Sequence, residues 1–200
     1  MQFPTDQRPL RLQARTRRAT LQNRAEFSRR ILGAVMALPQ YAVADTVLFY
    51  VGVRDEVQTV TDLKIALDSH RTIVVPWCEE GRRLQLFQLD SVDDLAIGKY
   101  GIPEPAEPLR SHPDRRIAMD QVDLAIVPGV AFDRRGGRIG QGRGYFDRLL
   151  SKARSDATLV GVAFECQIFD QIPMQAHDVL MDVVVTEDNI YSGKRQLMPH

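Results

Sequence analysis

The chain has 200 residues, of which 44% are hydrophobic and 26% are charged, and its 26 basic residues balance its 26 acidic residues. This length suits one domain with a single core, and the composition is ordinary for a globular protein. A net charge of zero gives no general attraction to nucleic acid or to an anionic membrane. No apolar run approaches the roughly 18 residues that would span a bilayer. We therefore expect a cytoplasmic protein, a monomer or a weak homodimer, that binds neither nucleic acid nor membranes; its arginine-rich start would also fit mitochondrial import.

Two helices are predicted within residues 1–40. The first covers residues 6–19, where Pro9 suits a first helical turn. Four arginines of this segment fall at helical spacing and share one face: Arg8, Arg11, Arg15 and Arg18. The second helix covers residues 24–38, whose apolar residues recur at steps of three and four until Pro39 ends it.

Beyond residue 40, short apolar segments alternate with polar ones. We expect strands over residues 47–51, 72–75, 84–89, 124–127, 159–163 and 183–186. A helix is predicted over residues 59–69, a proline-rich surface loop over 98–113, and a ragged polar tail over 187–200. Continuous apolar runs indicate strands that are covered on both faces. The pattern predicts an α/β fold of three layers, a mostly parallel sheet flanked by helices, in one Rossmann-like domain over residues 1–200.

The most informative segment is rich in glycine and precedes a helix that we expect to begin near Tyr145. Five of the nine residues from Gly136 to Gly144 are glycine. Glycine lets a ligand approach the main chain closely, and successive exposed N–H groups form a concavity that binds anions. The segment lacks the Gly-Lys-Ser/Thr of a P-loop, and Tyr145 stands where a G-x-G-x-x-G motif would need glycine. It is either a phosphate-binding loop or a long turn, with Asp133 expected to shape it through side-chain to backbone hydrogen bonds.

The same segment resembles a family signature. Residues 128–147 fit the pattern Pro-Gly-x-x-Phe-Asp-x-x-Gly-x-Arg-x-Gly-x-Gly-x-Gly-Tyr-x-Asp, which is similar to the signature of 5-formyltetrahydrofolate cyclo-ligases. Further pieces match in the order that the family has. They are the arginine-rich first helix, Tyr50 with residues 55–59, Val75-Pro76, residues 100–105, Ala163-Phe164 and residues 177–186. Ordered agreement along nearly the whole chain is not expected by chance.

The resemblance implies an enzyme that converts 5-formyltetrahydrofolate and ATP into 5,10-methenyltetrahydrofolate, ADP and phosphate, with Mg²⁺ as cofactor. Phosphorylation of the formyl oxygen turns a poor leaving group into a good one, and the neighbouring folate nitrogen then closes the ring. Catalysis of this kind depends on the placement of the γ-phosphate and the neutralisation of its charge. A glycine loop, arginines and a magnesium ion held by a carboxylate are the parts that it needs.

The resemblance also assigns residues to ATP. In the family the first helix supplies a lysine and an arginine; Arg11 matches the arginine, whereas Gln7 stands at the lysine position with Arg8 beside it. A solvated arginine face is the alternative for this helix. Within the loop, Arg143 and Tyr145 are expected to be catalytic. The full set expected to bind ATP is Gln7, Arg8, Arg11, Arg138, Ile139, Gly140, Gln141, Gly142, Arg143, Gly144, Tyr145 and Phe146.

Other residues are expected to bind folate and magnesium. Glu56 follows a predicted strand, and its carboxylate could accept two N–H bonds from the aminopyrimidine edge of a pterin. Tyr50 and Tyr100 are expected to lie against the flat heterocycle, although Tyr50 could instead be a buried strand residue. Asp147 is the expected magnesium ligand. Asp182 is a second candidate, which could instead cap a strand or pair with an arginine.

Another reading stays open for the function. A different phosphate-handling α/β enzyme, such as a sugar-phosphate isomerase or a CoA transferase, would have a similar layout, and fold alone does not separate such enzymes. The signature that ends in Tyr145-x-Asp147 favours the cyclo-ligase. An isomerase would also need no ATP. A nucleic-acid binder is disfavoured by the neutral charge and by the lack of a recognisable binding motif.

Overall fold

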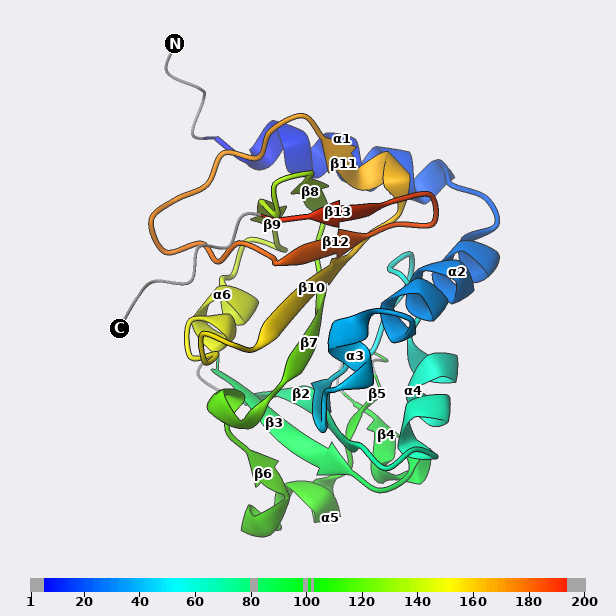
Figure 1. Ribbon diagram of the computed structural model, residues 1–200, viewed down its shortest axis with the longest axis vertical. Coiled ribbons are helices and arrows are strands. Elements are labelled where there is room, and N and C mark those ends of the chain that lie inside the picture. The colour runs from blue at the N-terminus through cyan, green and yellow to red at the C-terminus, as the bar shows by residue number, and fades with distance from the viewer. Residues whose placement is uncertain (1–5, 80–82, 99–100, 102, 194–200) are drawn as a thin grey trace.

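A computed structural model describes residues 6–79, 83–98, 101 and 103–193 of the chain. A large sheet runs through its centre with helices on both faces (Figure 1). The helices are α1 (Arg8–Thr20), α2 (Arg24–Met36), α3 (Pro39–Ala42), α4 (Val60–Leu67), α5 (Glu107–Arg110) and α6 (Tyr145–Leu150). None of them, within the described residues, is long and apolar enough to cross a bilayer. The strands are β1 (Thr46–Leu48), β2 (Thr72–Glu79), β3 (Arg83–Leu89), β4 (Leu95–Ile97), β5 (Pro103–Pro105), β6 (Arg116–Ile117), β7 (Leu124–Pro128), β8 (Ala131–Asp133), β9 (Arg138–Ile139), β10 (Thr158–Val162), β11 (Ile168–Phe169), β12 (Val183–Val185) and β13 (Ile190–Ser192).

The central sheet is mostly parallel, as the alternation of strands and helices predicted. Its order is β13-β12-β10-β7-β1-β2-β3-β6. The neighbouring strands β12, β10, β7, β1 and β2 run parallel. At one edge β13 pairs antiparallel with β12, and at the other β3 pairs antiparallel with β2 and β6 pairs antiparallel with β3. The carboxyl ends of the parallel strands therefore meet at one edge of the sheet, which is where α/β sheets bind their ligands.

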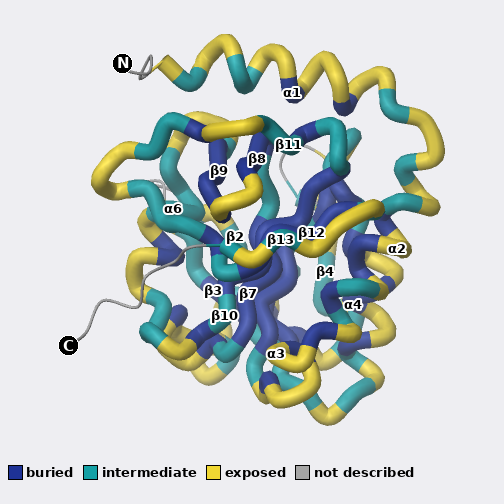
Figure 2. The backbone as a smooth tube through the Cα atoms, turned by 45° about the horizontal axis from the view of Figure 1, so that its top comes forward, coloured by how far each residue is buried: buried dark blue, intermediate teal, exposed yellow. Residues whose placement is uncertain are grey.

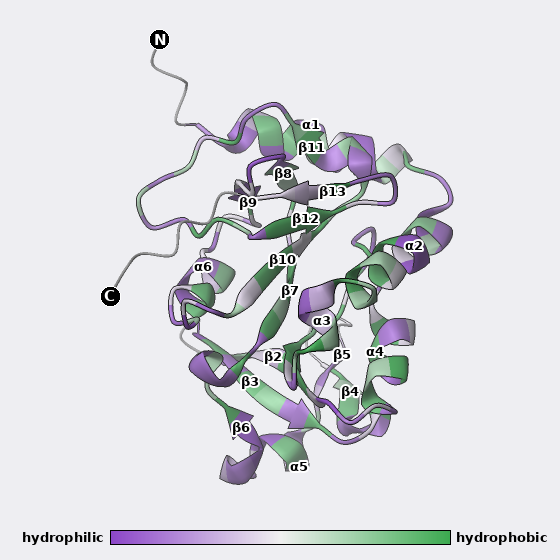
Figure 3. Cartoon of the chain, viewed as in Figure 1, coloured by the Kyte–Doolittle hydropathy of each residue, from purple (hydrophilic) through white to green (hydrophobic). Residues whose placement is uncertain are grey.

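Side chains along the parallel strands alternate between two cores. Val47 and Phe49 pack on the face that α2 and α4 cover, with Ile31 and Leu63 among their neighbours. Leu48, between them, packs on the opposite face, which α6 covers. Because successive side chains of a strand point to opposite faces, a strand covered on both sides has to be apolar throughout. Figure 3 shows the resulting concentration of apolar residues in β7, β10 and β12. The predicted α/β fold of three layers is confirmed.

A small second sheet lies under α1. Strand β8 pairs antiparallel with β9 and parallel with β11. Val130, Ile139 and Ile172 form a buried cluster there with Ala14 of α1. Most other residues of α1 are exposed, so that the helix lies along the rim of the molecule (Figure 2). Strands β8 and β9 belong to the glycine-rich segment, and the expectation that this segment forms only a loop or a long turn was therefore wrong.

The proline-rich segment over residues 98–113 is also more regular than expected. Its residues Pro103–Pro105 form β5, which pairs antiparallel with β4. Prolines are tolerated there because a strand at the edge of a sheet needs fewer backbone donors. Pro108 lies in the first turn of α5, where its lack of an N–H group costs the helix no hydrogen bond.

The tail from Glu187 was expected to be ragged, but residues 190–192 form strand β13. Its Tyr191 pairs with Val184 of β12 in antiparallel register. The strand covers an edge of β12 that would otherwise expose unpaired N–H and C=O groups. A polar composition concealed the strand, because an edge strand has only one packed face.

Candidate active site

The glycine-rich loop leaves the sheet where β7 ends, and Asp133 shapes its first half. The Asp133 side chain is buried, and its Oδ1 accepts hydrogen bonds from the backbone N–H groups of Arg135 and Gly137, both at 2.9 Å. Its Oδ2 accepts from the N–H group of Ile172 at 2.8 Å. These bonds close the turn between β8 and β9 and hold it on the following segment. The predicted role of Asp133 is thereby confirmed.

The second half of the loop, Gly140 to Gly144, reaches the surface next to α6. Gly142 and Gly144 have φ angles of +94° and +63°, which residues with a Cβ rarely adopt. Gln141, Gly142 and Arg143 are exposed. An exposed backbone of this conformation presents N–H groups that can bind an anion. The six residues of α6 add little dipole to such a site.

Arg138 and Asp147 form a buried ion pair below this loop. Nη2 of Arg138 lies 2.6 Å from Oδ1 of Asp147, and the two side chains are 2% and 17% exposed. Nη1 of Arg138 donates to the carbonyl oxygen of Pro128 at 3.3 Å, and Nε has no hydrogen-bond partner among the described residues. The guanidinium also lies 5.9 Å from the centre of the Phe146 ring. The guanidinium of Arg138 therefore binds Asp147 and is shielded from solvent, whereas the Asp147 carboxylate is partly exposed.

Helix α1 contributes polar side chains to the loop. Nε of Arg11 donates to the carbonyl oxygen of Gly140 at 2.9 Å, and Nη2 donates to Oε1 of Gln7 at 2.7 Å. Gln7 in turn donates to the carbonyl oxygen of Pro173 at 2.9 Å. The structure thus brings Gln7 and Arg11 to the loop, as the resemblance implied. The Arg8 side chain turns away, is 85% exposed, and pairs with Asp6.

The other loop residues lie around this centre. Arg143 is exposed, and Tyr145 is half-buried with the guanidinium of Arg148 lying 5.5 Å from its ring centre. Ile139 is buried in the cluster under α1, and its carbonyl oxygen accepts from the N–H group of Val130. Its side chain therefore supports the loop from below.

Glu56 lies in the turn after β1, beside the loop. Its Oε1 accepts a hydrogen bond from Nε2 of Gln141 and its Oε2 from the N–H group of Val53, each at 3.3 Å. Burial raises the pKa of the Glu56 carboxyl above its ordinary value. An open hollow of about 470 Å³ lies next to Glu56. The residues that line it are Leu21, Gln22, Asn23, Arg24, Ala25, Arg54, Glu56 and Gln58.

Of the two tyrosines expected to contact folate, Tyr50 is the one that the structure describes. Tyr50 is 4% exposed, and its hydroxyl donates to the carbonyl oxygen of Val57 at 2.7 Å. Burial raises the pKa of Tyr50 well above its ordinary value. Tyr50 is thus buried, as the alternative from the sequence held, although it lies two residues after the end of β1 rather than within a strand. Tyr100 lies outside the described residues.

Asp182 lies apart from Asp147. It directly precedes β12, and its Oδ2 accepts from the N–H group of Leu159, near the start of β10, at 2.7 Å. Asp147 instead lies with Arg138 beside Pro128, the last residue of β7. Asp182 therefore caps the amino end of a strand, which was its alternative role, whereas Asp147 lies by the carboxyl end of β7. Within the described residues, no group of three or more histidine, cysteine, aspartate or glutamate side chains could hold a metal ion.

One contact had no counterpart in the sequence-based expectations. Arg18 was expected on the same face as Arg11, but its side chain is only 5% exposed and pairs with Asp55. Asp55 directly precedes Glu56. Two adjacent acidic residues after a predicted strand are a weak signal, because sequence alone does not tell which carboxylate an arginine reaches.

Known proteins resemble this chain along most of its length. Residues 5–187 match the model of the 5-formyltetrahydrofolate cyclo-ligase family. A probable 5-formyltetrahydrofolate cyclo-ligase of Schizosaccharomyces pombe is 30% identical over 171 residues, which cover 78% of this chain and 81% of that protein. The 5-formyltetrahydrofolate cyclo-ligase of Mus musculus is 26% identical, with coverage of 89% and 91%. The solution structure of Aquifex aeolicus 5,10-methenyltetrahydrofolate synthetase superposes with a TM-score of 0.81 at 32% identity, covering 97% of each chain.

These matches and the fold define an α/β enzyme of the ligase class. More particularly, the chain belongs to the 5-formyltetrahydrofolate cyclo-ligase family. The family model covers both the arginine-rich helix α1 and the glycine-rich loop that α1 contacts.

Proposed function

We propose that this protein converts 5-formyltetrahydrofolate to 5,10-methenyltetrahydrofolate with the use of ATP and Mg²⁺ and the release of ADP and phosphate. The formyl oxygen attacks the γ-phosphorus, ADP leaves, and the product is an iminium phosphate. The neighbouring folate nitrogen then attacks the activated carbon and loses its proton. Phosphate leaves with the former formyl oxygen, which closes the ring and balances the atoms.

The contact between Arg11 and the carbonyl oxygen of Gly140 is the observation that carries this proposal. It joins a cationic side chain to an exposed glycine backbone 129 residues further along the chain. The Arg11 guanidinium also lies next to Gly142, 3.7 Å from where an alanine Cβ would stand. A cation and an exposed glycine backbone on one small surface suit the phosphates of a nucleotide. Holding the γ-phosphate in place is most of what a phosphoryl transfer requires of a protein.

Asp147 is the residue that would hold the magnesium ion. Mg²⁺ prefers oxygen ligands and is commonly bound by one or two carboxylates together with substrate phosphates. The Asp147 carboxylate is 17% exposed, and Oδ1 is the atom that pairs with Arg138. A single carboxylate with one oxygen engaged fits a metal that arrives with its nucleotide. When bound, the ion would neutralise negative charge on the phosphates during transfer.

Glu56 and the adjoining hollow support a folate site on the other side of the loop. A carboxylate can accept two parallel N–H bonds from an aminopyrimidine edge. Gln141 of the loop donates to this same carboxylate, so the two sites adjoin. Such proximity is needed because the formyl group has to reach the γ-phosphate.

The test is direct. Purified protein is mixed with 5-formyltetrahydrofolate, ATP and MgCl₂, and methenyltetrahydrofolate is followed by its near-ultraviolet absorbance while ADP is measured in parallel. We expect one ADP for each ring closed, and no product when ATP is left out or Mg²⁺ is chelated. Product formed equally well without ATP, or no product with all components present, would contradict the proposal.

A further inference from the structure

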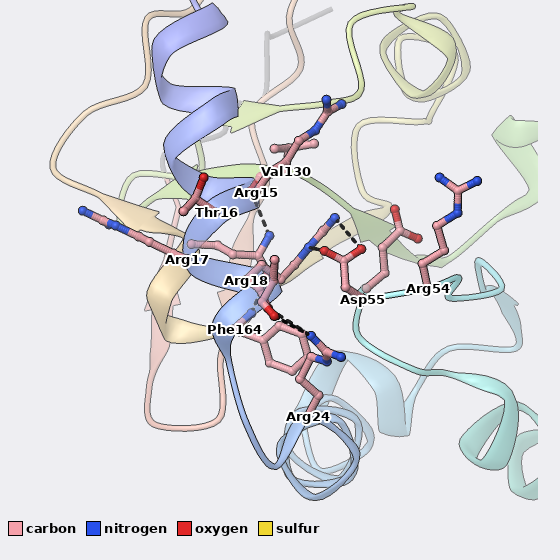
Figure 4. A network of polar contacts seen from close by, with 12 residues as sticks. Arg15, Thr16, Arg17, Arg18, Arg24, Arg54, Asp55, Val130 and Phe164 are labelled. Atoms are coloured by element: carbon pink, nitrogen blue, oxygen red, sulfur yellow. Dashed lines mark hydrogen bonds and ion pairs between the residues drawn. The ribbon is translucent and has the colours of Figure 1, made fainter.

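Arg18 and Asp55 form an ion pair that joins α1 to the turn after β1. Nε and Nη2 of Arg18 donate to the two oxygens of Asp55 at 2.8 and 3.1 Å, and Figure 4 shows the Arg18 side chain directed at Asp55. Only 5% of the Arg18 side chain is exposed. Burial pushes the pKa of Asp55 upward, but the hydrogen bonds and the charge of Arg18 outweigh it, so that this pKa lies below its usual value.

Stability alone is a weak reason for such a pair. Removing a guanidinium from water is unfavourable, and two apolar side chains of similar size often hold elements together equally well. What the two parallel hydrogen bonds provide instead is a fixed relative orientation of the two groups. The pair therefore fixes how the turn that carries Asp55 is oriented relative to α1.

The turn that carries Asp55 is under backbone strain. The N–H group of Glu56 donates to the carbonyl oxygen of Val53 at 3.0 Å. Between them, Arg54 has a φ of +54°, in the left-handed region that long side chains rarely adopt. Strain of this kind persists where surrounding contacts fix the conformation, and it is concentrated at functional sites. The pair with Arg18 is such a contact, one residue before Glu56.

A second connection runs from the same helix to Glu56. Nη2 of Arg15 donates to Oε1 of Gln141 at 2.6 Å, and Nε2 of Gln141 donates to Glu56. Arg11, one turn earlier, holds the carbonyl oxygen of Gly140. The amino-terminal part of α1 is thus fastened to the glycine loop, and its carboxyl-terminal part is fastened to the turn that presents Glu56.

We propose that Arg18 and Asp55 are positioning residues, which hold the Glu56 carboxylate at the angle that the aminopyrimidine edge of the folate requires. This inference rests on the proposed function. Neither side chain needs to touch the substrate, because Asp55 acts through the backbone of the turn. Loss of the pair lets the strained turn relax and rotates Glu56, whereas the loop contacts of Arg11 and Arg15 remain.

A double-mutant cycle tests the pair. Asp55→Asn, Arg18→Met and the double variant are compared with the parent protein by the KM for 5-formyltetrahydrofolate, the KM for ATP, and the melting temperature. Calorimetry of 5-formyltetrahydrofolate without nucleotide gives its Kd directly. We expect each single variant to raise the folate KM and Kd by about tenfold, the size of an ordinary coupling between contacting residues. The ATP KM should change less than about twofold, and the double variant should be no worse than either single variant.

Asp123→Asn is the matched control. Asp123 pairs with Arg154 and accepts hydrogen bonds from the N–H groups of Asp45 and Thr46, at the amino ends of β7 and β1 and away from Glu56. Its loss should lower the melting temperature without changing the ratio of the two KM values. If the Asp55 and Arg18 variants behave in the same way, or raise both KM values equally, the positioning role is overturned while the proposed function stands. Absence of turnover in the parent protein would instead overturn the proposed function, and this inference with it.

Discussion

Arg138 and Asp147 are partners in a pair whose guanidinium is almost fully buried, with 2.6 Å between Nη2 and Oδ1. Asp147 ends the sequence signature and is the candidate ligand for magnesium. In the structure, Asp147 also balances the charge of Arg138, whose side chain is buried. Substitution of Asp147 should therefore change two separable properties, the affinity for magnesium and the stability of the fold.

Asp147→Asn tests both properties. The amide keeps the size of the side chain but removes its charge, which leaves Arg138 buried without a counter-charge. We expect the free energy of unfolding in urea to fall by about 2 kcal/mol, the cost of weakening a buried hydrogen bond to a charged group. Activity should fall strongly and recover in part at high magnesium concentration.

The control for this variant is Asp188→Asn. Asp188 pairs with Arg30 at 3.5 Å, and both side chains are about half exposed, at 55% and 51%. Its loss should change the free energy of unfolding by no more than about 0.5 kcal/mol. An Asp147→Asn protein as stable as the Asp188→Asn protein would show that the Arg138 pair does not need the charge.

Gly142→Ala tests the backbone of the loop. A Cβ at this position would lie 3.7 to 3.9 Å from the Arg11 guanidinium, which is ordinary contact, so that the free protein has room for it. The φ of +94° remains unfavourable for alanine, and we expect a stability loss of about 1 kcal/mol. The ATP KM should rise more than this loss explains, because the methyl group faces the cation that would meet the phosphates. Steady-state kinetics and thermal melting measure the two effects.

Gly33→Ala is the matched control for the same substitution. Gly33 lies within α2, and a Cβ there would meet no heavy atom of the described residues within 4 Å, apart from its own helix backbone and chain neighbours. Alanine favours the helix over glycine, so the variant should be more stable by up to about 1 kcal/mol, with both KM values unchanged. A Gly142→Ala protein with an unchanged ATP KM would count against a nucleotide at this loop.

Arg11→Ala tests the helix that contacts the loop. The variant loses the hydrogen bonds to Gly140 and to Gln7. We expect the ATP KM to rise by about tenfold, which corresponds to one charge-assisted hydrogen bond, with the folate KM far less affected. Arg30→Ala on α2 removes an equal charge from a surface pair and should leave the ATP KM within about twofold. Equal effects of both variants would indicate a general effect of charge rather than a binding site.

Glu56→Gln gives a prediction with a definite pH dependence. Burial is the main reason why the pKa of Glu56 is raised, so the folded state holds this proton more tightly than the unfolded state. The contribution of Glu56 to stability is therefore lost as the pH rises from the ordinary pKa of the carboxyl through the raised one. Glutamine does not titrate. The melting temperature of the variant minus that of the parent should become more positive as the pH rises above the ordinary pKa of a glutamate carboxyl, about 4.3.

The same variant separates the two substrates. If Glu56 binds the pterin, its folate KM should rise far more than its ATP KM. If the difference in melting temperature between the variant and the parent stays constant with pH, the raised pKa of Glu56 is contradicted. Equal changes in the two KM values would show that Glu56 acts through the fold of the turn.

Much of the fold could be predicted because the signals for it are local. Residues 47–49 and 124–127 are apolar without interruption, and this alone indicates strands covered on both faces. The start of α6 at Tyr145 follows from the glycines before it. Strand β13 escaped prediction because its pairing partner β12 lies outside the segment, and no property of residues 190–192 reveals that partner.

The site was predictable as a list of residues but not as a geometry. The resemblance pointed to Arg11, Glu56 and the loop, and the structure brings these side chains together. It could not indicate that Arg138 would be buried against Asp147, and it could not decide among the alternatives for Asp182, one of which was the capping of a strand. Charge and residue type are the same for an arginine that faces solvent and for one that is buried. Only the packing of distant segments decides between them.

Helix α1 contacts the glycine-rich loop through residues that are distant in the sequence. Arg15 of α1 donates a hydrogen bond to Gln141, 126 positions later, and Gln7, which directly precedes α1, donates to Pro173, 166 positions later. A helix of 13 residues is marginal by itself in water, and α1 buries only Ala14 and Arg18. Apart from the Arg18–Asp55 pair, which spans 37 positions, these contacts of α1 depend on distant segments, and such long-range contacts form late in folding. The candidate site is therefore completed late, when α1 docks on a glycine-rich loop that has already folded against the sheet.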